Sequence, residues 1–252
     1  WERVGVDLQL DRGAVSIEHD DVGYLRGMER LVDAVCGLAS AQSLEEIAEI
    51  VRHAARDLAS ADGATFVLRD GDCCYYLDED AITPLWRGRR FPIGSCISGW
   101  AMLHEQSVAI SDIYADMRVP HDAYRPTFVK SLTISPIRTT EPVGAIGTYW
   151  ASHHEATPVE RRLLQALADS TAVAMESVRV REDLEARVAE RTAQLATANG
   201  DLEMLAVAAA HDLRSPVSIM AMYAQVLQAE VGQDPGRVGD AVRVISRTCG
   251  RS

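Results

Sequence analysis

Basic residues and long apolar runs are both scarce in this sequence of 252 residues. It has 25 Lys and Arg against 37 Asp and Glu, and the net charge of -12 argues against a nucleic-acid-binding surface, because phosphate recognition needs clustered basic side chains. No apolar run approaches the roughly 20 residues that cross a bilayer, and the start of the sequence shows no signal-peptide pattern. We therefore expect a cytoplasmic protein that has no membrane span and binds no nucleic acid.

Cysteine is also scarce, and the cysteine pattern argues against a fold that is held together by disulfides or by zinc. The number of cysteines is odd and their spacing matches no zinc site, so the sequence indicates neither a disulfide framework nor a bound metal. The five cysteines are Cys36, Cys73, Cys74, Cys96 and Cys249. We interpret them as reduced and mostly packed thiols, with a redox-sensing role for Cys96 as the alternative.

The N-terminal part of the chain predicts two helices. Residues 1–19 show no clear period, and we expect a tail or the end of a preceding domain there, followed by a helix within residues 20–42 that has one apolar face. A second helix follows Ser43, which is a good N-cap with Glu46 three residues further on, the capping-box pattern.

Short β-type runs follow these helices. Residues 64–68 and 73–77 flank a turn signal and predict a hairpin. Further strands are predicted at residues 108–110, 131–137 and 143–150. Several strands flanked by helices, with hairpin connections between the later ones, predict an α+β domain built on an antiparallel sheet.

A long helix is predicted from Thr157, an N-cap that is followed by Pro158 and by Glu160 in the capping-box position. Further along, its apolar residues narrow to a seam whose spacing alternates between four and three, a heptad pattern. The seam consists of Leu184, Val188, Arg191, Leu195, Ala198, Leu202, Leu205 and Ala209. A narrow seam needs a partner helix, so we expect a parallel homodimeric coiled coil in which Arg191 costs stability and fixes the register. A single surface helix is the alternative.

His211 opens the sequence His-Asp-Leu-Arg-Ser-Pro-Val near the end of the predicted helix. It is about 200° of helix rotation from each of the apolar residues Ala209 and Leu213, so we expect its ring to face solvent, where a second protein can reach it. Asp212 places a carboxylate beside the imidazole, which can accept the ring proton and leave the other nitrogen as the nucleophile. Pro216 removes one backbone donor and is expected to loosen the turn after the histidine.

This heptapeptide resembles the H-box of sensor histidine kinases, and Leu184–Asn199 is similar to the signalling helix that often precedes it. The resemblance implies that His211 is phosphorylated at a ring nitrogen by ATP, that Asp212 is the assisting acid or base, and that the phosphoryl group passes to an Asp of a response-regulator receiver domain. Ser215 stands where the family often has Thr or Asn, a position that supports dephosphorylation of the regulator.

The resemblance also assigns roles to the C-terminal segments. Residues 179–204 would be a signalling coiled coil, and residues 205–252 a dimerisation and histidine-phosphotransfer hairpin, with a second helix over residues 239–249 that completes a four-helix bundle in the dimer. ATP and Mg²⁺ would act through an ATP-binding domain whose motifs do not occur in this sequence. We therefore expect a phosphoryl acceptor that belongs to the protein-histidine kinases but is inactive as a kinase by itself.

Residues 43–178 resemble a GAF domain. The resemblance rests on Gly94–Trp100, Val108–Ile113, Ser131–Ile137 and Val143–Gly147. It implies a ligand pocket between the sheet and the loops around the middle strands. The sequence does not identify the ligand of that pocket, and a domain that binds none is one of the alternatives.

The resemblance implies that the ligand, if there is one, is a linear tetrapyrrole, a cyclic nucleotide or a haem. A covalent bilin usually needs a Cys beside a His before the Ser131 strand, where only His121 is present, and the Asn-Lys-Phe-Asp-Glu motif of cyclic-nucleotide binders is absent. Haem would need an axial ligand, for which the candidates are His104, His121, His153 and His154. The residues that line a small-molecule pocket or complete the core are Trp86, Trp100, Tyr114, Tyr124 and Phe128.

The sequence thus predicts a GAF domain that controls phosphorylation of His211 through a continuous helix. Two other hypotheses stay open. One is a non-catalytic dimeric GAF ligand-binding or scaffold protein with a vestigial H-box. The other is a photoreceptor or gas sensor that holds a bilin or a haem.

Overall fold

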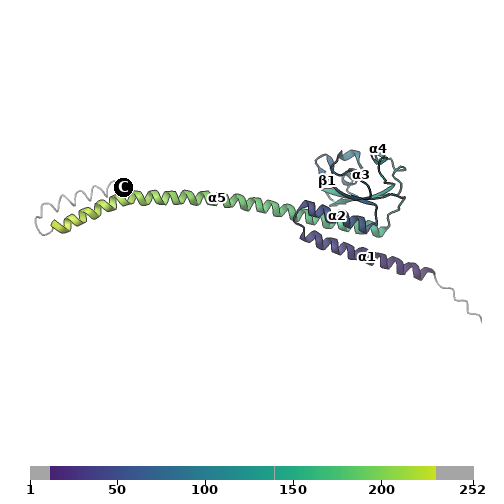
Figure 1. Ribbon diagram of the computed structural model, residues 1–252, viewed down its shortest axis with the longest axis horizontal. Helices are drawn as coiled ribbons and strands as arrows, with labels where there is room; N and C mark the ends of the chain where they lie inside the picture. Colours follow the sequence, from purple (N-terminus) through teal and green to yellow (C-terminus); the bar gives the residue numbers. More distant parts are fainter. Residues whose placement is uncertain (1–11, 139, 231–252) are drawn as a thin grey trace, which may run out of the picture. The chain divides into compact units, whose positions relative to one another are not determined.

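The computed structural model describes residues 12–138 and 140–230 of the chain (Figure 1). The chain divides into two units, Trp1–Glu182 and Asp183–Ser252. Within the described residues, the first unit contains every strand and the second unit is the continuation of one long helix. None of the helices in these two ranges is both long enough and apolar enough to span a bilayer.

Helix α1 (Arg12–Ser40) begins earlier than the sequence pattern predicts. Residues 12–19, which the sequence pattern places in a tail, already belong to the helix. A helix extends at little cost once its later turns have formed, because each added residue contributes one more backbone hydrogen bond, and no proline interrupts this stretch. Among residues 24–40, the buried side chains of α1 are Leu31, Ala34 and Leu38.

Helix α2 (Leu44–Leu58) begins where the capping-box pattern predicts. The backbone N–H of Glu46 donates to Oγ of Ser43 at 3.2 Å, and the N–H of Gln42 donates to the Glu46 carboxylate at 2.7 Å. These bonds satisfy two backbone donors near the start of the helix. The buried face of α2 consists of Ile47, Ala48, Val51, Ala55 and Leu58.

Six antiparallel strands form one sheet in the order β3-β2-β1-β6-β5-β4. The strands are β1 (Gly63–Asp70), β2 (Cys73–Ala81), β3 (Arg90–Pro92), β4 (Val108–Ile110), β5 (Ser131–Ile137) and β6 (Gly144–Trp150). The predicted hairpin is formed by β1 and β2, and the neighbouring strands β5 and β6 are buried along their whole length. Strand β3 was not predicted, because three residues are too few to show an alternating pattern.

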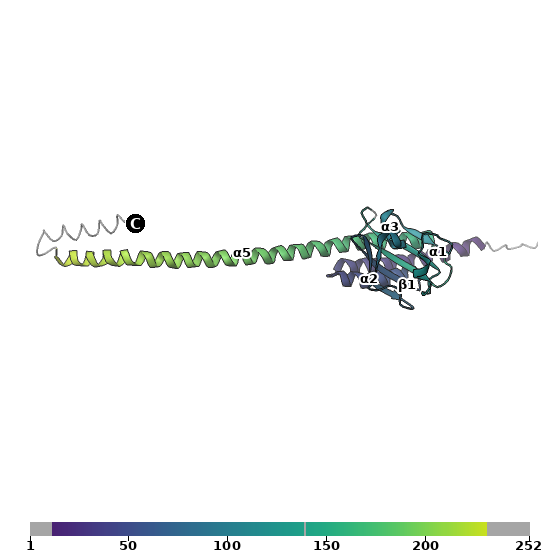
Figure 2. The ribbon, with the colours of Figure 1, turned by 90° about the horizontal axis from the view of Figure 1, so that it is seen from above.

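Helices cover both faces of the sheet (Figures 1 and 2). The later helices are η1 (Ile93–Ser95), α3 (Ile97–Leu103), α4 (His121–Tyr124) and α5 (Pro158–Glu230). Helices α1 and α2 and the first part of α5 pack on one face, around Phe66 and Ile146. The short helices and the loops cover the other face, whose core includes Tyr76 and Trp86. This architecture confirms the predicted α+β fold, an antiparallel sheet with flanking helices and a long C-terminal helix.

Helix α5 begins at the predicted capping box. The N–H of Glu160 donates to Oγ1 of Thr157 at 3.1 Å, and the N–H of Thr157 donates to the Glu160 carboxylate at 2.6 Å. Pro158 takes the first helical position, where its missing N–H costs no hydrogen bond. Pro216 lies inside the helix, which continues through it as far as Glu230. The predicted turn after this point and the predicted second helix lie outside the described residues.

Candidate functional site

The predicted phosphoacceptor motif lies in the C-terminal part of α5. The side chains of His211 and Asp212 are 84% and 85% exposed, and Nδ1 of the imidazole lies 3.5 Å from Oδ1 of the carboxylate. A carboxylate beside Nδ1 favours the tautomer that carries its proton there, which leaves the lone pair of Nε2 as the nucleophile. Ser215 is also exposed and, four residues after His211, lies on the same side of the helix. The three residues therefore occupy little more than one turn, open to a second protein.

The large apolar side chains of the predicted seam are exposed within the described residues. Every residue from Glu182 to Ser215 is exposed, and Leu195 and Leu205 retain 69% and 67% of their accessible surface. Full burial of such a side chain contributes about 1.5–3 kcal/mol, so pairing of this seam with another helix would be strongly favourable. Arg191 extends along the helix and donates from Nη1 to Oε1 of Gln194 at 3.1 Å.

On the loop-covered face of the sheet lies a small cavity of about 10 Å³. Its wall includes Tyr76, Trp86 and Tyr124, and their rings fill the space edge to face. The ring centroids of Trp86 and Tyr124 lie 4.8 Å apart, and those of Tyr76 and Trp86 lie 5.5 Å apart. A cavity of this size holds about one water molecule. Of the predicted pocket residues, Trp86 and Tyr124 therefore complete the core, whereas Trp100 and Phe128 are half-buried and Tyr114 is exposed.

Cys96 lies beside this cavity as the N-cap of α3, where its sulfur accepts a hydrogen bond from the N–H of Gly99 at 3.4 Å. The buried thiol of Cys74, on β2, also donates a hydrogen bond to the sulfur of Cys96. This bond lowers the pKa of Cys96. The same bond, together with burial, raises the pKa of Cys74. The sequence pointed to Cys96 but missed its partner, because 22 residues separate the two in the chain and no local pattern connects them.

The four candidate haem ligands all bond to protein oxygen atoms. The partners are the carbonyl of Trp100 for His104 at 2.8 Å, that of Asp116 for His121 at 3.1 Å, that of Ser111 for His153 at 3.1 Å, and the Glu160 carboxylate for His154 at 3.2 Å. None of the four lines the small cavity on the loop-covered face. Among the described residues, no group of three or more potential metal ligands comes together.

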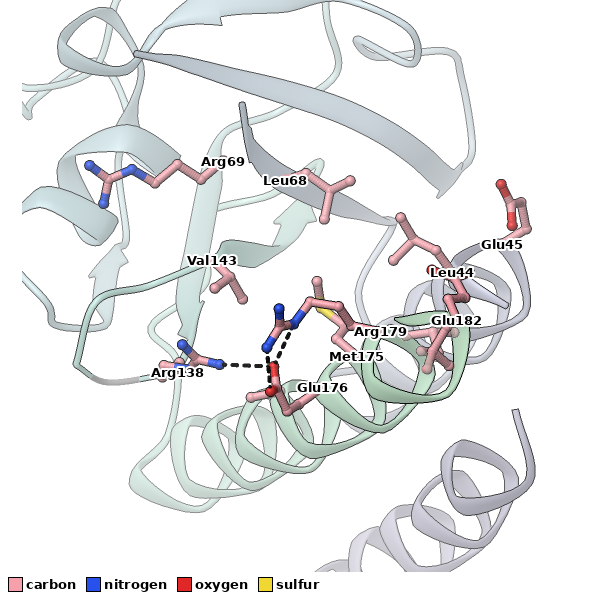
Figure 3. A pocket seen from close by; sticks show the side chains of 13 residues that line it. Leu44, Glu45, Leu68, Arg69, Arg138, Val143, Met175, Glu176, Arg179 and Glu182 are labelled. Atoms are coloured by element: carbon pink, nitrogen blue, oxygen red, sulfur yellow. Dashed lines mark hydrogen bonds and ion pairs between the residues drawn. The ribbon is translucent and has the colours of Figure 1, made fainter. Parts of the chain in front are cut away.

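A larger groove of about 630 Å³ lies on the opposite face of the sheet, between α2 and α5 (Figure 3). The Glu176 carboxylate at its edge accepts a hydrogen bond from Nη2 of Arg179 at 2.7 Å and lies 3.9 Å from Nη2 of Arg138. The Arg179 bond holds the pKa of Glu176 below its usual range. The apolar lining of the groove consists of Leu44, Ile47, Leu68, Val143, Ala172, Met175 and Val178. Sequence reasoning missed this groove, because its lining comes from segments far apart in the chain.

Comparison with known proteins identifies the domain that makes up the first unit. The family model of the GAF domain matches residues 41–176. No curated protein matched the chain.

Solved structures with the same fold come from proteins of different activity. The GAF domain of a phosphoenolpyruvate-protein phosphotransferase from Acinetobacter is 15% identical, with a TM-score of 0.54, and the match covers 61% of this chain and 94% of that chain. Free methionine-R-sulfoxide reductase from Neisseria meningitidis, in complex with its substrate, is 16% identical, with a TM-score of 0.55 and coverage of 63% and 93%. The chromophore-binding domain of a bacteriophytochrome from R. palustris is 13% identical, with a TM-score of 0.53 and coverage of 62% and 62%. At these identities the likeness establishes the fold alone.

Proposed function

This chain belongs to the GAF domain family, and on that premise we propose that it is the sensory part of a two-component histidine kinase. In this proposal the GAF domain receives a signal and controls phosphorylation of His211, from which the phosphoryl group passes to an Asp of a response-regulator receiver domain. The observation that carries the proposal is the exposed His211–Asp212 pair, on a helix whose first turns belong to the GAF domain.

The two residues of the pair have different roles in the proposed transfer. Nε2 of His211 attacks the γ-phosphorus of ATP, and ADP leaves, with Mg²⁺ and ATP delivered by a separate ATP-binding domain. Asp212 holds the proton on Nδ1 and stabilises the positive charge that the ring develops during the attack. In this proposal the hydroxyl of Ser215, on the same side of the helix, would orient a water molecule if the chain also dephosphorylates its regulator.

Signal passage requires an element that both sites share, and α5 is unbroken from Pro158 to beyond His211. A shift or rotation of α5 at the GAF domain would change the exposure or the bundle position of His211 in both protomers of a dimer. Insertion of one residue near Ala193 changes the heptad phase and is expected to alter the response to signal. An unchanged response in the inserted chain would contradict this route.

The phosphoacceptor role is tested with labelled ATP, Mg²⁺ and a separately purified histidine-kinase ATP-binding domain that is first shown to be active on its own phosphotransfer domain. We expect the wild-type chain to acquire an acid-labile, alkali-stable phosphoryl group that His211→Gln lacks. Asp212→Asn should slow labelling by about 100-fold, the lower range for general acid–base assistance.

The matched control is His153→Gln, which removes another exposed histidine outside the motif and should label as the wild type does. Label that remains on His211→Gln would contradict the assignment. A wild-type chain that stays unlabelled beside an active ATP-binding domain would favour the second candidate function.

That second candidate is a dimeric ligand-binding or scaffold protein without phosphoryl transfer. The observation that favours it is the groove of about 630 Å³ against α5, which is within the size range of small-molecule sites. Extra mass on the intact protein under native conditions, combined with absence of label at His211, would support this function over the kinase.

A further inference from the structure

The groove between α2 and α5 carries charges of opposite sign at its two ends and apolar side chains between them. Figure 3 shows Glu45 and Glu182 at one end and Arg138 at the other. Leu68 and Val143, which belong to the apolar lining, lie between these ends. All of these residues are in the first unit, so the groove exists independently of how the second unit is placed.

Arg138 gives the basic end of the groove a guanidinium group that is only weakly paired. Among the residues that the structure describes, its one ion pair is the long approach of 3.9 Å to the Glu176 carboxylate. Arg179 holds that carboxylate more closely, through hydrogen bonds from Nε at 3.1 Å and from Nη2 at 2.7 Å. Because a guanidinium has five N–H donors, Arg138 retains donors for the carboxylate of a ligand.

Two carboxylates make the opposite end of the groove acidic. Glu45 lies in the first turn of α2, and Glu182 lies on the part of α5 that passes this turn, where Arg181 donates to the carbonyl of Gln42. Both glutamates are exposed, and neither makes an ion pair with another residue of the described ranges. This end is therefore suited to an ammonium group.

The separation of the two ends matches the length of a short peptide. Glu176, which marks the basic end, and Glu182 are six residues apart on α5, or about 9 Å along the helix axis. An extended chain spans about 3.3–3.6 Å per residue, so a tripeptide reaches from one end to the other, whereas a single amino acid does not. The groove is open to solvent, so the amide groups of a bound peptide can stay hydrated while its apolar side chains contact the lining.

The groove and the seam use different sides of α5. Met175 lines the groove, and Leu184, the first seam residue, comes nine residues later. At about 100° per residue, nine residues correspond to half a turn in addition to two full turns. A ligand in the groove therefore leaves the seam free for the proposed coiled coil and contacts the helix that continues to His211.

We propose that this groove binds a short apolar peptide with free termini, whose carboxylate pairs with Arg138 and whose ammonium group pairs with Glu45 and Glu182. The peptide would be the signal that acts on α5. That role as a signal rests on the proposed function, whereas binding to the groove can be measured without any phosphoryl transfer.

The first test is isothermal titration calorimetry of the full chain with trileucine. We expect a Kd below about 1 mM. The capped peptide, N-acetyl-trileucine amide, keeps the apolar body but lacks both terminal charges, and it should bind roughly tenfold more weakly, because each exposed ion pair contributes up to about 1 kcal/mol. No binding of trileucine at about 1 mM, or equal binding of the two peptides, would overturn the proposal.

Two groove variants assign the charges to their partners. Arg138→Gln should raise the Kd of trileucine about fivefold and leave that of trileucine amide, which has no carboxylate, unchanged. Glu45→Gln with Glu182→Gln should also weaken trileucine, but should leave N-acetyl-trileucine, which has no ammonium group, unchanged. The matched controls are Arg125→Gln and Glu155→Gln, which change exposed charges outside the groove and should not alter any of these values. A groove variant that weakens every peptide equally, or none, would contradict the assigned pairing.

Failure of the groove can be distinguished from failure of the kinase. A chain that is labelled at His211 but does not bind trileucine would overturn the peptide site and leave the proposed function standing. A chain that binds trileucine with the expected variant pattern but is not labelled beside an active ATP-binding domain would support the site and contradict the kinase.

Discussion

Helix α5 has two regions that use apolar residues differently. Along the GAF domain it buries Leu163, Leu164, Leu167 and Ala168 against the sheet and its flanking helices, whereas every residue from Glu182 to Ser215 is exposed. The buried region has apolar side chains on adjacent positions, which cover a broad face, whereas between Leu184 and Leu202 the exposed region has its large apolar side chains at heptad positions. The difference teaches that the GAF domain is stabilised within one chain, whereas the packing that the rest of α5 lacks in one chain would come from the proposed homodimer.

The largest expected effect comes from charges placed on the seam. Leu195→Glu with Leu202→Glu would bury two carboxylates in each chain of a dimer and should raise the Kd by roughly 1,000-fold or more. Circular dichroism should show a loss of helix as this part of α5 uncoils, with the near-ultraviolet signal of the GAF domain retained. Ala193→Glu, about 200° away from Leu195 on the helix, is the matched control. Equal dissociation of both variants would contradict the seam.

A change in the core of the GAF domain should lower the stability of the domain without weakening the dimer. Ile146 is 1% exposed, and Ile146→Ala is expected to lower the free energy of unfolding by about 2–5 kcal/mol in urea titrations. The Kd of the dimer should stay unchanged in buffer, where the domain remains folded. Ile82→Ala, at an exposed position, should cost no more than about 0.5 kcal/mol. A large effect of Ile146→Ala on the Kd would contradict the separation of α5 into a region stabilised by the GAF domain and a region that needs a second chain.

Arg191 offers a smaller and opposite test of the seam. It interrupts the row of apolar residues, so Arg191→Leu is expected to tighten the dimer by about tenfold, equivalent to 1.4 kcal/mol. Ala193→Leu adds a leucine off the seam and should leave the Kd unchanged. Weaker association of the Arg191→Leu chain, measured by sedimentation equilibrium, would show that the arginine makes a stabilising contact across the dimer.

The smallest effect concerns the thiol pair of the GAF domain. The pKa of Cys96 is lowered by the hydrogen bond that Cys74 donates, so removal of the donor in Cys74→Ala should raise it. The midpoint of Cys96 alkylation against pH should therefore move to higher pH, in a chain whose Cys36, Cys73 and Cys249 are replaced by Ser. An unmoved midpoint would show that the helix N-terminus and Tyr76 suffice to stabilise the thiolate.

Features with a local cause were predicted from the sequence. Both capping boxes appear in the structure, since an N-cap and a glutamate three residues later interact within one turn. Strands β4 and β5 have the predicted bounds, and the β1–β2 hairpin follows from its turn signal. His211 is exposed in a single chain together with every residue from Glu182 to Ser215, so its position on the outer side of a dimer stays a prediction.

Features that depend on packing between distant segments were not predicted. The Cys74–Cys96 pair joins a strand to a helix start, and the groove beside α5 is lined by α2, β1, the β5–β6 turn and α5. The small size of the cavity beside Trp86 depends on how four aromatic rings fit together, which no spacing rule gives. The early start of α1 has a different cause, because its first turns extend a helix that is stabilised further along.

The most direct test of the account is a native mass spectrum of the purified chain at micromolar concentration. We predict a homodimer, with twice the 27.5 kDa mass of the chain, because the exposed seam of α5 needs a second helix to pack against. The dimer should disappear in Leu195→Glu with Leu202→Glu and persist in Ala193→Glu. A monomeric wild-type chain would contradict the account, because the exposed apolar side chains of α5 would then have no partner helix and His211 would lack its proposed dimeric setting.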